Sequence, residues 1–469
     1  MKCNVLFVSI FDLTRVFFEV CKSLRTGGHN VFWMTTSELW TGWLLDQGEH
    51  RESVLELVYD QSAFLTGTER ERTISAIVKC ERNTGMSVNE CMMMDRFVLY
   101  KNRPDINEYM YLYYRDIKQF LTDHQITHVF AEPTNTNELL TCMICRDMGI
   151  KFLAPRDMRF PHRRLVFTRD FQETRLSVST TRNSAKPQVG RVLLEEFEES
   201  KSVPFTFKKY SAKPVVDSQK AAESTIRRIK LVRRSSRNNL THHDLSERLQ
   251  GIAKRVVNGF YLRHIQDYDS LDKIGGRIAF YPLHVQPEAS IDVQGPFFSD
   301  QLKLIRDIRR SLPIDTTLIV KEHPNFLGQR GPGFFNRIRL IPNVKLLRHD
   351  VSTFEVYKRA AIVFTVTGTA AYEAGMLGIP AVTFTKMFFG GLSSVRHCPD
   401  ISELQGIVDE LLEGFRRDYN ADCRFMSELM DHSYEGYWTD PFFDPSVMDP
   451  DNISKLSRAF EQVLSYELA

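Results

Sequence analysis

The sequence predicts an α/β protein of two doubly wound, Rossmann-type domains that face each other across a cleft. Two arrays of short apolar runs and helical stretches carry this prediction, one starting with CNVLFVS at residues 3–9 and the other at Arg277. Such alternation is typical of βαβ units in a parallel sheet. Of the 469 residues, 42% are hydrophobic, enough for large cores, which excludes a disordered, collagen-like or coiled-coil chain.

The first array opens with a strand, a helix that Gly27-Gly28 end, and a second strand. Residues 41–100 have helical periodicity but no clear strand pattern. The elements expected in this array are strands 3–9, 29–34, 127–131 and 150–153, and helices 13–24, 107–124 and 138–148. The polar loop EPTNTN, residues 132–137, follows the third of these strands, so we expect it to face the ligand crevice.

The second array is clearer, because turn residues separate its apolar runs. Its expected elements are strands 277–283, 316–321, 344–347, 361–366 and 381–384, and helices 299–311, 352–360, 370–377 and 402–415. A helix near residues 245–260 precedes it and another near 453–467 ends the chain. The domains expected are therefore an N-terminal Rossmann-like domain (1–160), a basic insertion with a linker helix (161–270), a C-terminal Rossmann-like domain (271–415) and a helical tail (416–469).

The net charge of +2 is the sum of unlike parts. Residues 201–240 hold eleven Lys/Arg and two acidic residues, a local charge of +9, so the rest of the chain carries −7. The start of the chain reads as a buried strand rather than a signal peptide, and no run of about 18 apolar residues appears. Cys142 and Cys145 form a CxxC on an apolar helix face, which favours structural thiols over a metal or redox site. We therefore expect a cytoplasmic protein that holds no metal.

The most informative stretch is FTVTGTAAYEAGMLGIP, residues 364–380. A buried strand delivers Thr367, Gly368 and Thr369 to the first turn of a helix, whose unpaired N–H groups favour phosphate binding without a metal ion. Gly368 would let the backbone approach the ligand. Glu373, one turn on, is placed to accept hydrogen bonds from ribose hydroxyls. The alternative is that Thr369 only caps the helix and Glu373 is a surface charge.

Two further strand ends of this array carry polar residues. LIVKEHPN, residues 318–325, ends in Lys321, His323 and Pro324, and the histidine can donate to a phosphate or a base carbonyl, unless it is purely structural. The loop YPLHVQPEASIDVQGP, residues 281–296, supplies Gln286 and two carboxylates.

The candidate catalytic carboxylates are Glu288 and Asp292 in that loop, with Glu132 in the first array as their rival. A carboxylate at a cleft can deprotonate an acceptor hydroxyl or act as a nucleophile. Glu132 and Asn135 are also candidates for the acceptor side. The alternative for Glu288 and Asp292 is a solvated loop.

The succession PLHVQPEASID, KEHP and TGTAAYEAGMLGIPAV resembles the bacterial capsule polysaccharide biosynthesis family over roughly residues 275–390, and the segment from HVFAEPTNTN resembles it more loosely. That family includes GT-B glycosyltransferases that use CMP-activated Kdo and related acidic sugars. By this resemblance, His323 and Pro324 match the motif that holds CMP, and Thr367 and Thr369 match the hydroxyl pair at the donor phosphate. His284 stands where the family often has Gln, and QPE-ASID where an Asp-Ser loop is usual.

The resemblance implies a GT-B-like fold and a metal-independent glycosyltransferase of capsule or surface polysaccharide synthesis, with no cofactor. The donor would be a CMP-linked ulosonic acid such as Kdo, and the acceptor a glycan or glycolipid hydroxyl. The residues expected to bind the nucleotide sugar are Gln286, Lys321, His323, Pro324, Thr367, Gly368, Thr369 and Glu373. A UDP-sugar 2-epimerase, a transferase using a UDP- or GDP-sugar, and a non-catalytic scaffold at the inner membrane remain alternatives.

The basic segment IRRIKLVRRSSR, residues 226–237, has three apolar residues at helical spacing and no acid. It predicts peripheral binding to an anionic inner membrane, whereas few aromatics interleave with its charges, which argues against nucleic acid. A solvated insertion is the alternative. The residues proposed to contact lipid are Arg227, Arg228, Lys230, Arg233, Arg234 and Arg237.

Overall fold

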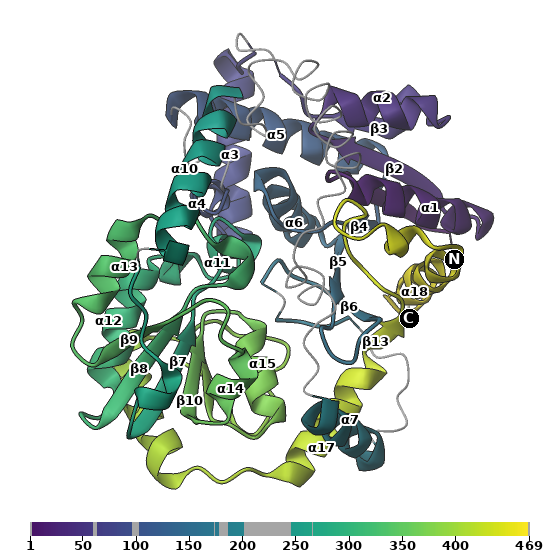
Figure 1. Cartoon of the computed structure of the whole chain (residues 1–469). Coiled ribbons are helices and arrows are strands. Elements are labelled where there is room, and N and C mark those ends of the chain that lie inside the picture. Colours follow the sequence, from purple (N-terminus) through teal and green to yellow (C-terminus); the bar gives the residue numbers. More distant parts are fainter. Residues whose placement is uncertain are drawn as a thin grey trace. The chain divides into compact units, whose positions relative to one another are not determined.

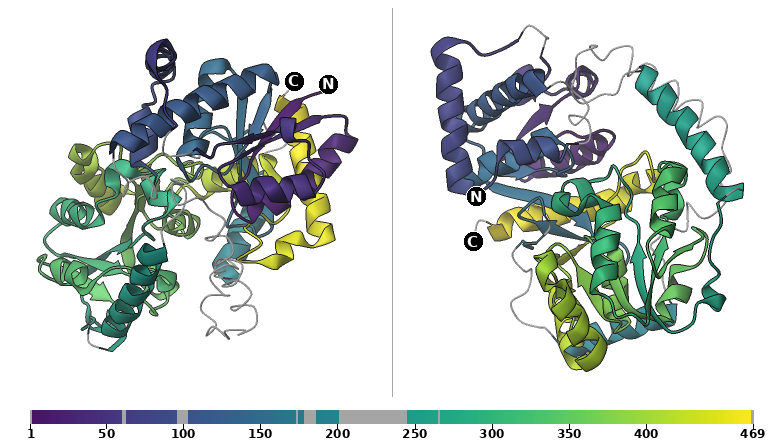
Figure 2. Two further views of the ribbon diagram at one scale, coloured as in Figure 1. Left: turned by 90° about the horizontal axis from the view of Figure 1, so that it is seen from above. Right: turned by 90° about the vertical axis from the view of Figure 1, so that its left-hand side faces the viewer.

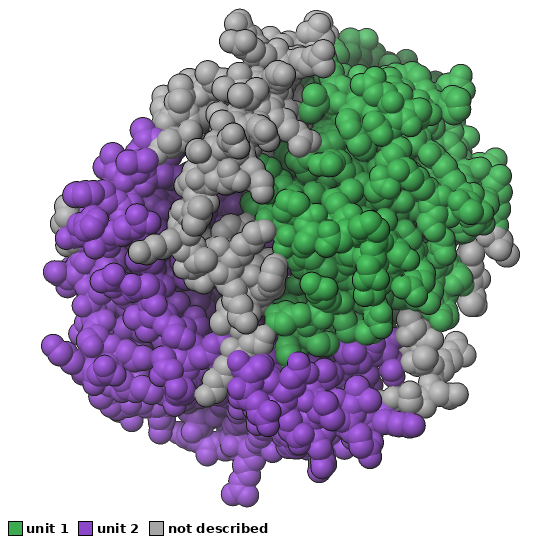
Figure 3. Space-filling model, turned by 45° about the vertical axis from the view of Figure 1, so that its right-hand side comes forward, with its two compact units in different colours: residues 1–182, 215–245, 432–469 green, residues 183–214, 246–431 purple. Residues whose placement is uncertain are grey.

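The structure is a computed structural model, and it describes residues 2–59, 63–95, 103–172, 174–177, 186–200, 245–264 and 266–467. These residues fall into two compact units (Figure 3). Unit 1 contains the described residues up to Ser177 and from His432 onward. Unit 2 contains residues 186–200 and 246–431.

Unit 1 is built around a seven-stranded sheet of order β13-β6-β5-β4-β1-β2-β3. Strands β1 to β5 are parallel, whereas β6 pairs antiparallel with β5 and β13 antiparallel with β6. The strands are β1 Asn4–Val8, β2 Asn30–Thr35, β3 Val54–Glu56, β4 His128–Phe130, β5 Lys151–Asp157, β6 Arg164–Thr168 and β13 Ser433–Glu435. The helices are α1 Leu13–Thr26, α2 Glu38–Asp46, α3 Gly67–Thr84, α4 Val88–Met93, α5 Arg103–Asp123, α6 Thr136–Met148 and α18 Pro450–Glu467.

The core of unit 1 joins the two ends of the chain. Helix α18 lies beside α1 in Figure 1 and in the turned views of Figure 2. Its Phe460 ring is fully buried, 4.6 Å from the ring of Phe130 and 4.9 Å from that of Phe167. The apolar face of the last helix is therefore part of the first domain's core.

Unit 2 contains a six-stranded, fully parallel sheet of order β12-β11-β10-β7-β8-β9. Its strands are β7 Arg277–Pro282, β8 Thr316–Lys321, β9 Val344–Leu347, β10 Ala360–Thr365, β11 Ala381–Thr383 and β12 Val395–His397. Its helices are α7 Pro187–Ser200, α10 Leu245–His264, α11 Ala289–Asp292, α12 Gln301–Ser311, α13 Pro332–Arg339, α14 Thr353–Tyr357, α15 Thr369–Met376, α16 Leu404–Asp409, the π-helix Glu410–Gly414 and α17 Tyr419–Asp431.

Counted along the chain within each unit, both sheets contain the strand order 3-2-1-4-5-6 of a Rossmann fold, and the sheet of unit 1 adds β13 as a seventh strand beside β6. The prediction of two doubly wound α/β domains is therefore confirmed, and a cleft between them stays a prediction. In each sheet the order reverses between the first and fourth strands, β1 and β4 in unit 1 and β7 and β10 in unit 2. Ligands of such folds bind beyond the carboxyl ends of the strands at this switch point.

The units divide the chain differently from the predicted domains. The expected separate tail does not exist as such, because α17 belongs to unit 2 whereas β13 and α18 belong to unit 1. Strand β6 and helix α7 lie within the stretch expected to be a basic insertion. Helix α7 packs closely on α17, since a Cβ at Gly190 would overlap the carbonyl group of Cys423. Among the described helices, none is long and apolar enough to cross a lipid bilayer.

Candidate functional site

The switch point of unit 2 brings together the ends of three adjacent strands, β10, β7 and β8. The loop after β7 starts at Leu283, the segment after β8 starts at Glu322, and the turn after β10 leads into α15. The three motifs that the sequence singled out in this domain therefore lie at one edge of one sheet.

The turn before α15 is fixed by its own chain. Gly368 is the N-cap of the helix, with φ −72° and ψ 154°, so Thr369 is the first helical residue rather than the cap. A Cβ at Gly368 would lie 2.5 Å from Thr365 Oγ1 and 3.1 Å from His284 Cε1. The close packing of this turn therefore requires a glycine at position 368. That Gly368 also lets the backbone approach a ligand stays a prediction.

The hydroxyl of Thr367 is already used within the chain. It donates to the carbonyl oxygen of Ser290 at 2.6 Å, and the residue is buried. Because a hydroxyl has one proton to donate, Thr367 is not a donor to a phosphate in this structure, contrary to the prediction. Its bond instead ties the turn after β10 to the loop after β7. Thr369, only partly buried at the start of α15, remains as the hydroxyl of the pair.

His284, which the sequence analysis did not select, holds the same turn. Its Nε2 atom accepts the N–H of Val366 at 3.0 Å and lies 2.9 Å from Thr365 Oγ1, which itself accepts the N–H of Gly368 at 3.0 Å. Burial, with Arg330 and His323 nearby, lowers the pKa of His284 to about 3. The imidazole is therefore neutral, with its proton on Nδ1, and Thr365 donates to Nε2.

The loop after β7 is held by a chain of side-chain amides. Gln301 accepts the N–H of His284 at 2.8 Å and donates to Gln286 Oε1 at 3.0 Å. Gln286 in turn donates to Asp292 Oδ1 at 3.0 Å. Asp292 is buried and also accepts the N–H of Glu288 at 3.0 Å. Gln286 and Asp292 therefore shape the loop.

The two candidate carboxylates of this loop differ in access. Asp292 is 8% exposed and bound to loop atoms, whereas Glu288 is exposed and accepts only the hydroxyl of Ser290 among the contacts recorded for its carboxylate. The expectation that either could act as the catalytic carboxylate is therefore narrowed to Glu288, because a base must reach the proton it removes.

A buried arginine joins β8 to the loop after β7. Arg330 Nη1 lies 2.8 Å from both carboxylate oxygens of Glu322, and Arg330 Nη2 donates to the carbonyl oxygen of His284. Glu322 Oε1 also accepts the N–H of His323 at 2.7 Å. The guanidinium lies over the rings of Phe326 and Phe334, at 5.4 and 5.3 Å from their centroids. Arg330 thus positions His323 and the HP motif.

Lys321 places a cation at this edge. The residue is 4% exposed, and burial lowers the pKa of its ammonium to about 8, opposed by Glu373, Asp350 and Glu322. Among the described residues its ammonium has no hydrogen bond and no ion pair within 4.0 Å. The charges of these three carboxylates offset part of the cost of burying the ammonium, and an incoming anion would offset more of it.

Glu373 is not a free surface charge. Its Oε2 accepts the hydroxyl of the buried Tyr357 at 2.9 Å, and its charge acts on Lys321. The expected contact with a ribose would have to share this carboxylate with Tyr357.

The switch point of unit 1 is polar as well. Glu132 Oε1 lies 3.4 Å from Arg156 Nη1, and Asn135 precedes α6. The N–H and hydroxyl of Thr136 both donate to the buried carboxylate of Asp95, at 2.5 and 2.6 Å. The chain thus supplies its own anion to the first turn of α6. Glu132 and Asn135 lie together at this edge, in a different unit from Glu288.

One further prediction can be compared with the structure, and another falls outside the described residues. Cys142 and Cys145 are buried, and burial raises the pKa of Cys142 to about 12, in keeping with structural thiols. The six basic residues proposed to contact lipid, Arg227 to Arg237, lie outside the described residues.

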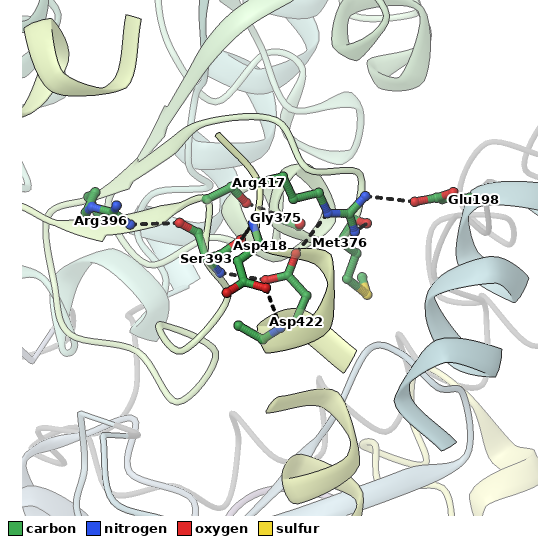
Figure 4. Close-up of polar contacts among 10 residues, drawn as sticks. Glu198, Gly375, Met376, Ser393, Arg396, Arg417, Asp418 and Asp422 are labelled. Atoms are coloured by element: carbon green, nitrogen blue, oxygen red, sulfur yellow. Dashed lines mark hydrogen bonds and ion pairs between the residues drawn. The ribbon is translucent and has the colours of Figure 1, made fainter. Parts of the chain in front are cut away.

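The far end of α15 is anchored by Arg417 (Figure 4). Its Nη2 donates to the carbonyl oxygen of Met376 at 2.7 Å, its Nε to Asp422 Oδ2 at 2.8 Å and its Nη1 to Glu198 Oε1 at 3.0 Å. Asp422 is fully buried and also accepts the N–H of Ser393 at 2.7 Å. The helix that carries the turn is therefore fixed at both ends.

The fold and this edge together define a two-domain, Rossmann-type protein whose second domain has a polar switch point. The family model for "capsule polysaccharide biosynthesis protein" matches residues 183–417, half of the chain, and the chain belongs to this family. The match covers nearly all of unit 2 and ends at Arg417.

The chain shares little sequence identity with two similar solved structures. No curated protein sequence matches the chain. Similar solved structures include a β-Kdo 2,7-transferase, KpsC, of Thermosulfurimonas dismutans, with 11% identity, a TM-score of 0.32, and 74% of this chain and 89% of that one covered. Another is the UDP-GlcNAc 2-epimerase of Methanocaldococcus jannaschii in complex with UDP-GlcNAc and UDP, with 13% identity, a TM-score of 0.29, and 99% and 100% covered.

Proposed function

We propose that the chain is a metal-independent glycosyltransferase of capsule or surface polysaccharide synthesis. It would take a CMP-activated ulosonic acid such as Kdo and transfer the sugar to a hydroxyl of a glycan or glycolipid. The observation that carries the proposal is the convergence of Lys321, His323 and the first turn of α15 at the switch point of unit 2.

These three groups suit a phosphate that carries a nucleoside. The ammonium of Lys321 makes no ion pair within 4.0 Å among the described residues, and the N–H groups of the first turn of α15 favour negative charge. His323 is partly exposed just beyond the end of β8, two residues after Lys321, so it can contact the nucleotide. Membership of the capsule family supports a sugar as the group carried by this phosphate.

Glu288 is the carboxylate assigned to the reaction. As the acceptor oxygen forms its bond to the anomeric carbon, Glu288 would take the proton of that hydroxyl, and CMP would leave with the electron pair of the broken C–O bond. Lys321 and the first turn of α15 would stabilise the charge that develops on the leaving phosphate. Glu132 in unit 1 remains the second candidate for the carboxylate.

Nucleotide binding is tested by thermal unfolding with CMP, UDP and GDP. A nucleotide at a hundredfold excess over its Kd stabilises the folded state by about 2.7 kcal/mol. We expect CMP to raise the Tm, and His323→Ala to abolish this rise while His397→Ala, an exposed histidine on β12, retains it. If no nucleotide raises the Tm at millimolar concentration, both the glycosyltransferase and the 2-epimerase function are excluded. The non-catalytic scaffold would then be the remaining alternative.

Turnover separates the enzymatic alternatives. CMP-Kdo with a capsule acceptor should give glycosylated product, and Glu288→Gln should lose turnover but keep the rise in Tm with CMP. Release of free sugar from UDP-GlcNAc without acceptor would instead identify a 2-epimerase. Glycosylation only from a UDP- or GDP-sugar would retain the transferase and change its donor.

A further inference from the structure

Unit 2 has a second feature, at the opposite edge of its sheet from the switch point. A surface groove of about 570 Å³ lies where the chain enters β8 and β9, next to the ends of α12 and α13. Figure 1 shows these two helices side by side. The groove is lined by Arg306, Arg309, Arg310, Leu312, Ile314, Arg337, Leu340, Ile341 and Pro342. We call these nine residues the arginine–aliphatic surface.

The arginines of this surface are hardly neutralised, and no acidic residue lines it. Arg306 is exposed and has no hydrogen bond or ion pair among the described residues. Arg310 is 83% exposed, and its ion pair with Asp307 Oδ1 is long, at 4.0 Å. Arg337 donates only to the carbonyl oxygen of Gly333. Arg309 is used internally, donating to the carbonyls of Thr316 and Pro313. Three guanidinium groups are thus available to an anion.

The aliphatic residues of the surface are unusually accessible. Ile314 is 92% exposed and Leu340 is 81% exposed, each in a short loop just before a strand. Large apolar side chains held this far into water gain most when they enter an apolar phase. They stand beside Leu312, Ile341 and Pro342, which widen the apolar part of the same groove.

We propose that the arginine–aliphatic surface docks on an anionic phospholipid bilayer. Guanidinium groups bind lipid phosphates in a bidentate manner, and exposed aliphatic side chains insert at the boundary between headgroups and acyl chains. A soluble polyanion would satisfy the arginines but leave Ile314 and Leu340 in water, so the combination favours a bilayer. None of its nine residues belongs to the proposed nucleotide site or to the basic segment at residues 226–237.

A local probe tests the contact in the full chain. All eight cysteines are buried, so Ile314→Cys can be labelled selectively with an environment-sensitive NBD fluorophore. Phe297→Cys is the matched control, because Phe297 is 83% exposed in the same unit but follows the loop after β7. Vesicles of phosphatidylcholine containing phosphatidylglycerol should shift the emission of the label at position 314 to the blue and leave that at position 297 unchanged.

Two controls define the ligand. Pure phosphatidylcholine vesicles should give no shift. Equal shifts at both positions, or none at either, would overturn the proposal. A shift of the label at position 314 with soluble polyphosphate as large as that with the anionic vesicles would also overturn it and identify a soluble polyanion instead.

Charge reversal tests the arginines by vesicle co-sedimentation. The variant R306E/R310E/R337E should bind anionic vesicles at least tenfold more weakly, since three basic residues at the membrane surface are lost. The matched control R72E/K79E/R82E changes three exposed basic residues of α3 in unit 1 and should bind like the wild type. Equal loss in both variants would mean that only net charge matters and would reject this surface.

A third variant tests the aliphatic residues. Ile314→Ser with Leu340→Ser should bind at low salt but be released at a salt concentration that the wild type withstands, because the apolar contact is not screened. Every variant should retain its Tm and the rise in Tm with CMP. A variant that loses vesicle binding but keeps the rise in Tm with CMP has an impaired membrane contact and an intact nucleotide site. The two measurements therefore distinguish a failure of the docking surface from a failure of the proposed enzymatic function.

Discussion

The imidazole of His284 is neutral near pH 7, because burial and the charges of Arg330 and His323 lower its pKa to about 3. It acts as a fixed hydrogen-bond acceptor for the turn before α15. A glutamine carbonyl offers the same acceptor, which gives a physical reason why the two residue types can exchange at this position.

Substitution of His284 should separate this role from simple packing. His284→Ala leaves the N–H of Val366 and the hydroxyl of Thr365 without their acceptor, so we expect the free energy of unfolding to fall by about 3 kcal/mol and CMP to bind more weakly. His284→Gln should recover most of both. Denaturant unfolding and calorimetric titration with CMP measure the two effects. A Gln variant as impaired as the Ala variant would contradict the role of acceptor.

Lys321 predicts an unusual dependence of stability on pH. The folded chain releases the proton of this lysine near pH 8, whereas the unfolded chain holds it until about pH 10.5. Between these values the unfolded state binds more protons, so the free energy of unfolding rises with pH, by about 3 kcal/mol in all. Below pH 8 the group contributes no slope.

The variant Lys321→Met isolates this contribution. It should be at least as stable as the wild type at pH 7, because the cost of burying the charged ammonium is removed, and should lack the rise above pH 8. It should also lose the stabilisation by CMP. The difference between wild-type and variant unfolding curves across pH 7–10 is the measurement. A flat difference would show that Lys321 is solvated or paired.

The sequence could predict the site residues that lie at or just beyond the carboxyl ends of strands. Lys321, His323 and Thr369 lie at one sheet edge as expected, because parallel strands place their carboxyl ends together. Arg330 and Gln301 were missed, since each reaches the site from a loop or helix that has no periodic signature there. The roles of Thr367 and Asp292 were also beyond the sequence, because hydrogen-bond partners depend on the folded loop.

At the scale of elements, α15 depends on the Arg417 junction at its far end. Arg417→Met would leave the fully buried carboxylate of Asp422 without its cation, so we expect the free energy of unfolding to fall by about 3–5 kcal/mol. Arg348→Gln removes a pair exposed at both partners and should cost about 1 kcal/mol or less. Thermal or denaturant unfolding of both variants gives the comparison, and equal losses would refute the role of the junction.

Strands β7 to β11 of unit 2 and five of its helices were predictable within a few residues, whereas helices α7, α11, α13 and α17 were not expected. Strands β8 and β9 have the predicted bounds, because buried parallel strands are continuous apolar runs between turns. Strands β3, β6, β12 and β13 were missed, since each has only three to five residues and lies at or near a sheet edge. Short edge strands take their conformation from pairing, which a local pattern does not contain.

At the scale of the whole molecule, α18 is part of the first domain rather than a tail. Phe460→Ala should therefore lower the free energy of unfolding by about 3–5 kcal/mol, because it opens a cavity among the rings of Phe7, Phe130 and Phe167. Phe443→Ala, which changes a 54% exposed ring, is the control and should cost about 1 kcal/mol or less. Similar small losses in both would mean that α18 is dispensable.

This arrangement sets the order in which the chain can mature on the ribosome. Translation delivers the first six strands of unit 1 early, then all of unit 2, and only then β13 and α18. Unit 2 can thus be complete at Asp431 while the aromatic face around Phe7 and Phe130 is still uncovered. Until Phe460 emerges, the second domain of the nascent protein can be folded while the first is incomplete. The exposed aromatic face of the first domain is the part that chaperones would recognise.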